Sequence, residues 1–568
     1  MIRFLTAVFC GALLACAGRA QTTAPAAPRP VAPGTFVLAP QPIDTYIQHA
    51  WNTLTRSMSD CHSLVDPKVK STPVLYLPKD LPMPKDVAAL PAKCGVHVER
   101  LPVRIRHFGQ IRRGEIATPG LLYLPHPYVV PGGRFNEMYG WDSYFILLGL
   151  LRDGRTDLAR GMVDNFFFEI EHYGGVLNAN RTYYFTRSQP PFLSSMVLAV
   201  YKAEAARATT PEQRLRLKAW LTRAYRDGQR DHSVWTSRIH RAGNTGLAHY
   251  YDVGEGPVPE MSDDSTYYPD VIRWLLAHPA RDPGYLVELP DHPKPAETAK
   301  IAASSCNLKI SVVCAHAHVH GQWLTRDFYK GDRAMRESGF DTSFRFGPFS
   351  GSTHHFAGVD LNSLLYKYEL DMARMAALLH KPSDAAQWKR QAAARRAAIN
   401  RYLWNPRRGL YMDYDFVTHR HSTYVYATAF YPLWAGAASN AQARAVEKNL
   451  DLLEHPGGLA MSTNNSGMQW DLPFGWAPVT WLTIDGLHKE GDDADALRLA
   501  REFSHTIEAN YARDGTIVEK YNVVTGSSQV QVTAGYKQNQ VGFGWTNGVY
   551  LEMEHLLASP QAAASPGK

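Results

Sequence analysis

The segment 131–144 reads PGGRFNEMYGWDSY, and its glycine pair predicts a turn that leads into a helix over the apolar run 145–151. Within this segment Arg134 offers a fork of hydrogen-bond donors, Asp142 accepts hydroxyl groups, and Trp141 presents a flat apolar face. This combination matches the polar edge and the apolar face of a pyranose ring. The alternative for the same residues is a buried ion pair that holds a loop.

A second aromatic loop lies closer to the C-terminus. Segment 469–478 reads QWDLPFGWAP, so it repeats the Trp-Asp pair at Trp470 and Asp471 and adds Trp476. Other distinctive segments occur between and after the two loops: NANR at 178–181, RSQPP at 187–191, RESGFD at 336–341, EKY at 519–521 and GFGWTNGV at 542–549.

Taken in this order, from about residue 120 to 555, these segments resemble the signatures of the trehalases, an inverting family of glycoside hydrolases. The resemblance implies an all-α fold. It would be an (α/α)6 barrel of six inner and six outer helices, with long loops that carry the active site at one end. The expected reaction is hydrolysis of α,α-trehalose to two glucose molecules, without a cofactor.

The resemblance also implies which residues act. Asp341 matches the general acid of the family and Glu519 matches its general base, and inversion requires such carboxyl groups roughly 6.5 to 9.5 Å apart. Two positions, Asn180 and Trp476, are as well explained by structural roles. The expected substrate contacts are Arg134, Trp141, Asp142, Asn178, Arg187, Gln189, Glu260, Gly339 and Trp470.

Two segments depart from the family pattern. The family's Arg-Pro-Glu is replaced by Val258-Pro259-Glu260, so one sugar-binding guanidinium is missing. A glycine-rich lid that normally carries a glutamate is replaced by TAGYKQNQ at 533–540, where Gly535 or Tyr536 takes that position. The alternatives are therefore hydrolysis or phosphorolysis of another α-glucoside, or a non-catalytic sugar-binding barrel.

No other ligand class is predicted. The formal charge of +7 reflects 60 basic and 53 acidic residues, which are spread along the chain without a basic run that would suggest nucleic acid. The alternating His316, His318 and His320 would share one face of a strand, but no carboxylate stands at a convincing ligand spacing. We therefore predict no metal site there, and none at the pairs His354–His355 and Asp263–Asp264.

The N-terminus predicts export. Residues 1–20 have the basic start, short apolar run and small residues of a signal peptide, so the protein is expected to be secreted or periplasmic, without a membrane span. A lipoprotein signal ending at Cys16 is the alternative. An Ala/Pro-rich leader at 21–40, one catalytic domain at 41–558 and a flexible tail at 559–568 should follow.

Four cysteines then remain in an oxidising compartment, namely Cys61, Cys94, Cys306 and Cys314. Sequence order favours Cys61 with Cys94 and Cys306 with Cys314, but four cysteines allow three pairings and the sequence does not choose among them.

Apolar residues at helical spacing predict several helices between the loops. One covers 383–404, with Ser383 as its cap and Trp388, Ala392, Ile399 and Leu403 on one face. A second carries Val446, Leu450 and Leu453 and stops at 455–458. A third carries Ala496, Leu499, Phe503 and Ile507 and ends at 513–515.

Overall fold

The structure is a computed structural model that describes residues 41–65, 72–111, 115–116, 118–260, 266–289, 294, 317–533 and 539–559. The predicted signal peptide, leader and tail beyond 559, together with Cys306, Cys314, His316, the pair Asp263–Asp264 and both lid positions Gly535 and Tyr536, lie outside the described residues. The described residues belong to one compact unit that begins at Pro40.

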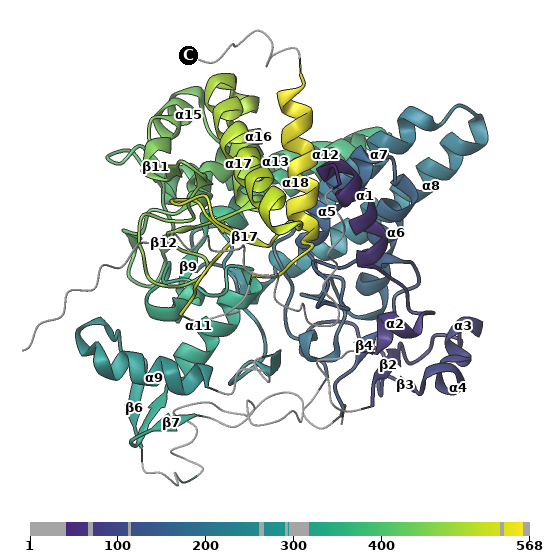
Figure 1. The fold of residues 1–568 in the computed structure, drawn as a ribbon, viewed down its shortest axis with the longest axis horizontal. Helices are drawn as coiled ribbons and strands as arrows, with labels where there is room; N and C mark the ends of the chain where they lie inside the picture. The colour runs from purple at the N-terminus through teal and green to yellow at the C-terminus, as the bar shows by residue number, and fades with distance from the viewer. Residues whose placement is uncertain are drawn as a thin grey trace, which may run out of the picture. The chain divides into compact units, whose positions relative to one another are not determined.

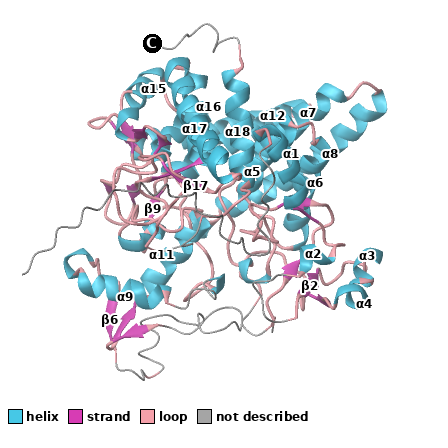
Figure 2. Ribbon diagram, in the orientation of Figure 1, coloured by secondary structure: helices cyan, strands magenta, loops and turns pink. Residues whose placement is uncertain are grey.

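Helices make up most of the fold (Figure 2). Six of them follow one another in a closed series of packing contacts, and five of the six are labelled in Figure 1. In order of contact they are α5 (Asp142–Arg152), α7 (Leu193–Arg207), α12 (Val359–Leu378), α14 (Tyr431–Ala435), α16 (Ala477–Glu490) and α18 (Gly544–Leu557), which packs back on α5.

A second set of helices packs on this series. It comprises α1 (Ile43–Leu54), α6 (Thr156–His172), α8 (Pro211–Trp235), α13 (Pro382–Tyr402), α15 (Asn440–Glu447) and α17 (Asp493–Asp514). One helix of each set shows a difference in burial. Helix α16 buries side chains around most of its circumference, whereas α13 buries one stripe that includes Trp388, Ala392 and Ile399. A helix that is apolar on nearly every side needs neighbours on every side.

The predicted helices are present, with corrected ends. Helix α13 begins at Pro382, which occupies the first helical position, and Lys381 precedes it without a side-chain cap, so the prediction that Ser383 caps this helix is wrong. Proline's fixed φ and missing N–H suit that first position. Helix α17 ends as predicted, with Gly515 in the left-handed conformation at φ 66°.

The second predicted helix is shorter than expected. Helix α15 ends at Glu447, and a separate 3-10 turn covers Leu450–Leu452. Val446, Leu450 and Leu453 are nevertheless all buried, so their apolar spacing indicated the core correctly although it did not indicate one continuous helix.

The N-terminal part adds a small parallel sheet in the order β3 (His97–Arg100), β2 (Val74–Leu77), β4 (Leu121–Leu122). Beside it stand the short helices α2 (Cys61–Leu64), α3 (Lys85–Ala88) and α4 (Leu90–Cys94). A disulfide joins Cys61 to Cys94, with 5.8 Å between their Cα atoms, which resolves part of the pairing that the sequence left open.

Short antiparallel strands also occur in the loops, so the fold is mostly helical rather than purely α (Figure 2). The pairs are β1 (Thr55–Arg56) with β5 (Tyr128–Val129), β10 (Trp404–Asn405) with β11 (Leu410–Tyr411), β14 (Glu454–His455) with β15 (Gly458–Leu459), and β16 (Phe474–Trp476) with β17 (Lys520–Asn522). Two three-stranded sheets are β13 (Arg420–His421), β12 (Tyr414–Asp415), β9 (Phe356–Ala357) and β6 (Leu286–Glu288), β8 (Gln322–Leu324), β7 (His318–Val319).

Helix α9 (Tyr267–Ala277) packs on the strands β7 and β8, and α11 (Arg326–Glu337) follows β8 in the chain. Helices of the part of the chain that the structure describes are all too short or too polar to cross a bilayer.

Candidate active site

A cavity of about 510 Å³ is lined by all eleven residues that were predicted from the sequence as catalytic or substrate-binding. Most of them lie on loops that precede helices of the closed series. Residues 131–141 precede α5, residues 178–189 precede α7, and residues 469–476 precede α16. The residues brought together are Arg134, Trp141, Asp142, Asn178, Arg187, Gln189, Glu260, Gly339, Asp341, Trp470 and Glu519.

Asp341 presents its carboxyl group to the cavity, and its side chain is 40% exposed there. Although this side chain is open to the cavity, the surrounding protein separates the Asp341 carboxyl group from bulk water, and this desolvation raises its pKa to about 7 against the opposing effect of the Arg336 and Arg187 guanidinium groups. Arg336 Nη1 lies 3.7 Å from Asp341 Oδ2. A carboxyl group that titrates near neutral pH can hold a proton and donate it, as a general acid must.

The loop that carries Asp341 is fastened to the second aromatic loop. Gln469 donates its amide Nε2–H to the carbonyl of Asp341, and the backbone N–H of Trp470 donates to the carbonyl of Thr342 at 3.1 Å. Asp471 Oδ2 accepts from the backbone N–H of Phe344 at 2.8 Å. The second loop therefore holds the loop that carries Asp341 through Gln469, Trp470 and Asp471, and Trp470 also lines the cavity.

Glu519 also lines the cavity, immediately before strand β17, and is only 5% exposed. The buried ammonium group of Lys520 donates to Glu519 Oε2 at 2.7 Å. The backbone of Glu519 is held at both ends, because its N–H donates to Gln540 and its carbonyl accepts from Trp545 Nε1 at 3.2 Å. These hydrogen bonds fix the direction of the Glu519 side chain, and a carboxylate oxygen held in this way can accept a proton from water.

Tryptophans form one wall of the cavity. Trp470 stacks on Trp476 with 3.8 Å between ring centroids, and Trp141 lies 5.8 Å from Trp470. Gly339 passes close to this wall with φ 77°, and a Cβ atom at this position would come within 3.0 Å of the Trp141 ring. A side chain at position 339 would be strained twice, in its backbone and against the indole.

Several predicted contact residues also hold the loops through hydrogen bonds, and the buried ion pair of the alternative interpretation is present between Arg181 and Glu137. Gln189 Oε1 accepts from the backbone N–H of Trp141 at 3.1 Å, and Asn178 Nδ2 reaches the carbonyl of Arg336 at 3.4 Å. Asn180 is structural, because it accepts from the backbone of Met138 at 2.7 Å. Burial, reinforced by the carboxylates of Glu519 and Asp341, raises the pKa of Asp142 well above its ordinary value.

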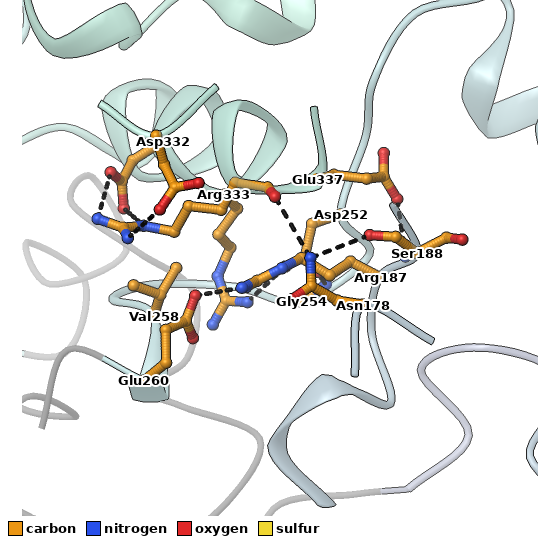
Figure 3. Close-up of polar contacts among 12 residues, drawn as sticks. Asn178, Arg187, Ser188, Asp252, Gly254, Val258, Glu260, Asp332, Arg333 and Glu337 are labelled. Carbon is orange, nitrogen blue, oxygen red and sulfur yellow. Dashed lines mark hydrogen bonds and ion pairs between the residues drawn. The ribbon is translucent and has the colours of Figure 1, made fainter. Parts of the chain in front are cut away.

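Arg187 pairs with Glu260 and lies 3.6 Å from Asp252, and Figure 3 shows its guanidinium between these carboxylates. Among the described residues, none accepts a hydrogen bond from Arg187 Nη1 or donates one to Glu260 Oε2. Val258 lies beside Glu260 in Figure 3 and is fully buried, and its backbone N–H donates to the Tyr268 hydroxyl at 2.8 Å.

Sequence reasoning missed Arg336, which also lines the cavity. Its guanidinium lies over the ring of Tyr267, 5.2 Å from the centroid, and it is 5% exposed. The signal was available, since Arg336 opens the RESGFD segment that contains Asp341, but the residue was interpreted as part of the motif rather than as a contact.

Val258→Arg is expected to destabilise the protein and not to restore a sugar contact. Position 258 has no free space, because Val258 packs in a core that includes Tyr267 and Tyr268, so the guanidinium would overpack a buried site. Unfolding by urea should show a loss of about 2 kcal/mol or more. Val258→Ile is the matched control, with a smaller loss. An unchanged unfolding midpoint together with a lower KM would contradict this expectation.

Two carboxyl groups that line one cavity together with indole rings and guanidinium groups are typical of a glycoside hydrolase site. The sequence model of the family described as Trehalase matches residues 83–270 and 317–557. The chain therefore belongs to the trehalase family of glycoside hydrolases.

Individual relatives agree with this assignment. The chain is 34% identical to the cytosolic neutral trehalase of Saccharomyces cerevisiae over 559 residues, which cover 88% of this chain and 69% of that protein. It is 36% identical to the periplasmic trehalase of Xanthomonas campestris pv. campestris, over 80% of this chain and 72% of that protein. The solved structure of neutral trehalase Nth1 from S. cerevisiae matches with a TM-score of 0.71 and 32% identity, covering 92% of this chain and 96% of that chain.

Proposed function

We propose that the protein hydrolyses α,α-trehalose to two glucose molecules with inversion. The observation that carries the proposal is the placement of Asp341, with its pKa raised to about 7, in the same cavity as the lysine-bound Glu519. The volume of about 510 Å³ lies in the range of small-ligand sites, roughly 300 to 1,000 Å³. We also propose that the closed series of helices is the inner layer of an (α/α)6 barrel.

In the proposed reaction Asp341 donates its proton to the glycosidic oxygen as the bond from that oxygen to the anomeric carbon breaks. Glu519 takes a proton from the water that attacks the anomeric carbon from the other face, so water ends as a hydroxyl on one glucose and a proton on Glu519. Lys520 holds the Glu519 carboxylate and stabilises its charge before the attack. The guanidinium groups of Arg187 and Arg336 supply donors for sugar hydroxyls.

We propose that Arg336 supplies a sugar-binding guanidinium beside Arg187. It lines the cavity, and its Nη1 lies 3.7 Å from Asp341 Oδ2, whereas Val258 is buried and bound to the Tyr268 hydroxyl through its backbone N–H. The other α-glucosides remain the rival substrates. Phosphorolysis is disfavoured because the Glu519 carboxylate would repel phosphate at the position of the attacking water.

We further propose that the protein is exported. Besides the N-terminal sequence, the Cys61–Cys94 disulfide supports this, because such bonds persist in oxidising compartments. The relative from X. campestris is named a periplasmic trehalase.

The test is to follow purified enzyme on trehalose by proton NMR, with kojibiose, nigerose and maltose in parallel. Inversion at one sugar and release of the other predict α- and β-glucose in equal amounts at early times. Early signals from α-glucose alone would contradict inversion. Faster turnover of another disaccharide would reassign the substrate, and binding of trehalose without glucose release would leave a sugar-binding protein.

A further inference from the structure

Three side chains of the types that coordinate metals lie together outside the cavity. Asp327 lies in the first turn of α11, and His354 and His355 lie in a 3-10 turn, Thr353–His355, that packs on α11. Sequence reasoning gave the histidine pair no role, because Asp327 lies 27 residues earlier than His354 and no spacing rule connects the two positions.

The distances fit a shared cation. His354 Nε2 and His355 Nε2 lie 3.0 Å and 3.3 Å from the same carboxylate oxygen, Asp327 Oδ1, and the three ligand atoms all lie within 4.8 Å of one another. Nitrogen and oxygen ligands bind Zn²⁺ at about 2.0 to 2.2 Å, so neighbouring ligands in a tetrahedral site stand about 3.3 to 3.5 Å apart. Both histidine–aspartate separations are within a few tenths of an ångström of this value.

The surroundings leave access from one side. His354 is 8% exposed, whereas the side chains of His355 and Asp327 are 29% and 52% exposed, so water can complete a coordination sphere. The nearby cations are engaged elsewhere. Arg326 and Lys330 lie 3.2 Å and 3.3 Å from Glu255, and Lys330 also donates to backbone carbonyls.

We propose that Asp327, His354 and His355 bind a divalent first-row transition cation, with water as the fourth ligand. The cation would join the start of α11 to the 3-10 turn. Helix α11 spans 12 residues, about 18 Å, and leads at its other end to Arg336 and Asp341. The site is therefore structural: it fixes the helix that delivers the acid loop and takes no part in the bond cleavage.

The experiment uses the whole enzyme, treated with EDTA and desalted, with Zn²⁺ as the probe. Calorimetric titration should show one high-affinity Zn²⁺ per chain, and Zn²⁺ should raise the melting temperature while kcat on trehalose stays unchanged. Asp327→Asn and His355→Ala should each weaken binding by about 10-fold or more and abolish the shift in melting temperature. His505→Ala removes an exposed histidine on α17 and is the matched control.

Two outcomes would overturn the proposal. One is equal Zn²⁺ affinity in the control and in both site variants, which would show scattered surface binding. The other is no Zn²⁺-dependent shift in the unaltered enzyme, which would leave two histidines that only donate hydrogen bonds to Asp327. Asp327→Asn keeps the side-chain volume, so a folded variant is available even if His355→Ala unfolds.

Discussion

Asp341→Asn is expected to lower kcat on trehalose by about 10² to 10⁴-fold or more, because an amide cannot donate the proton that the leaving sugar oxygen needs. Initial rates of glucose release measure the loss. An α-glucosyl fluoride substrate provides the control, since fluoride departs without a proton. The variant should therefore retain far more activity on the fluoride than on trehalose. Equal losses on both substrates, or a near-normal rate on trehalose, would remove Asp341 from the acid role.

The raised pKa of Asp341 gives this variant a second signature. Activity of the unaltered enzyme should fall as pH rises through about 7, because the acid then loses its proton. A carboxyl group with a folded pKa above its unfolded pKa of about 3.9 makes the folded state less stable as pH rises between those values. The amide of the Asp341→Asn variant does not titrate, so it would not carry this penalty. At pH 8 the variant should melt no lower than the unaltered protein.

Glu519→Gln is expected to cause a loss of similar size on trehalose, about 10² to 10⁴-fold or more, because the amide cannot take the proton of the attacking water. Here the fluoride substrate should not restore activity, since it still needs water to attack. The two substrates thus separate the acid from the base. The same change at an exposed glutamate, Glu212→Gln on α8, should leave both rates unchanged.

Folding must be checked for Glu519→Gln in particular, because Lys520 is fully buried and its ammonium group donates to the Glu519 carboxylate. The amide oxygen can still accept that hydrogen bond, but the buried ammonium loses its charge partner. A modest fall in melting temperature is therefore expected. Full activity on trehalose in a folded variant would contradict the base role.

The sequence predicted which residues line the cavity, but it did not predict the contacts that hold them. The residues from Arg134 to Glu519 were identified from motifs in a fixed order, and a motif indicates which side chains come together but not their distances or hydrogen bonds. Asp471 holds the loop that carries Asp341 by accepting a hydrogen bond from the backbone N–H of Phe344. A side-chain pattern in the sequence does not indicate such a hydrogen bond.

Helices with a clear apolar periodicity were predicted from the sequence. Helix starts at proline and strands of two residues were not. Apolar spacing identified the buried face of α13, but Pro382 moved the start of that helix away from Ser383. The two-residue strands have too few side chains to show an alternation, so their pairing comes from contacts between distant segments. The cluster of Asp327 with the histidine pair was also missed, because its members come from separate segments of the chain.

The β16–β17 ribbon couples the aromatic wall to the proposed base, because Trp476 lies opposite Lys520 in the register and Glu519 comes immediately before. The same backbone continues the connection toward α18, since the N–H of Glu519 donates to the carbonyl of Gln540 and that of Gly542 donates to the carbonyl of Ile517. A substitution that displaced the backbone of the segment 539–542 would therefore also displace the Glu519 carboxyl group, so attempts to broaden the substrate range through this segment are expected to lower turnover.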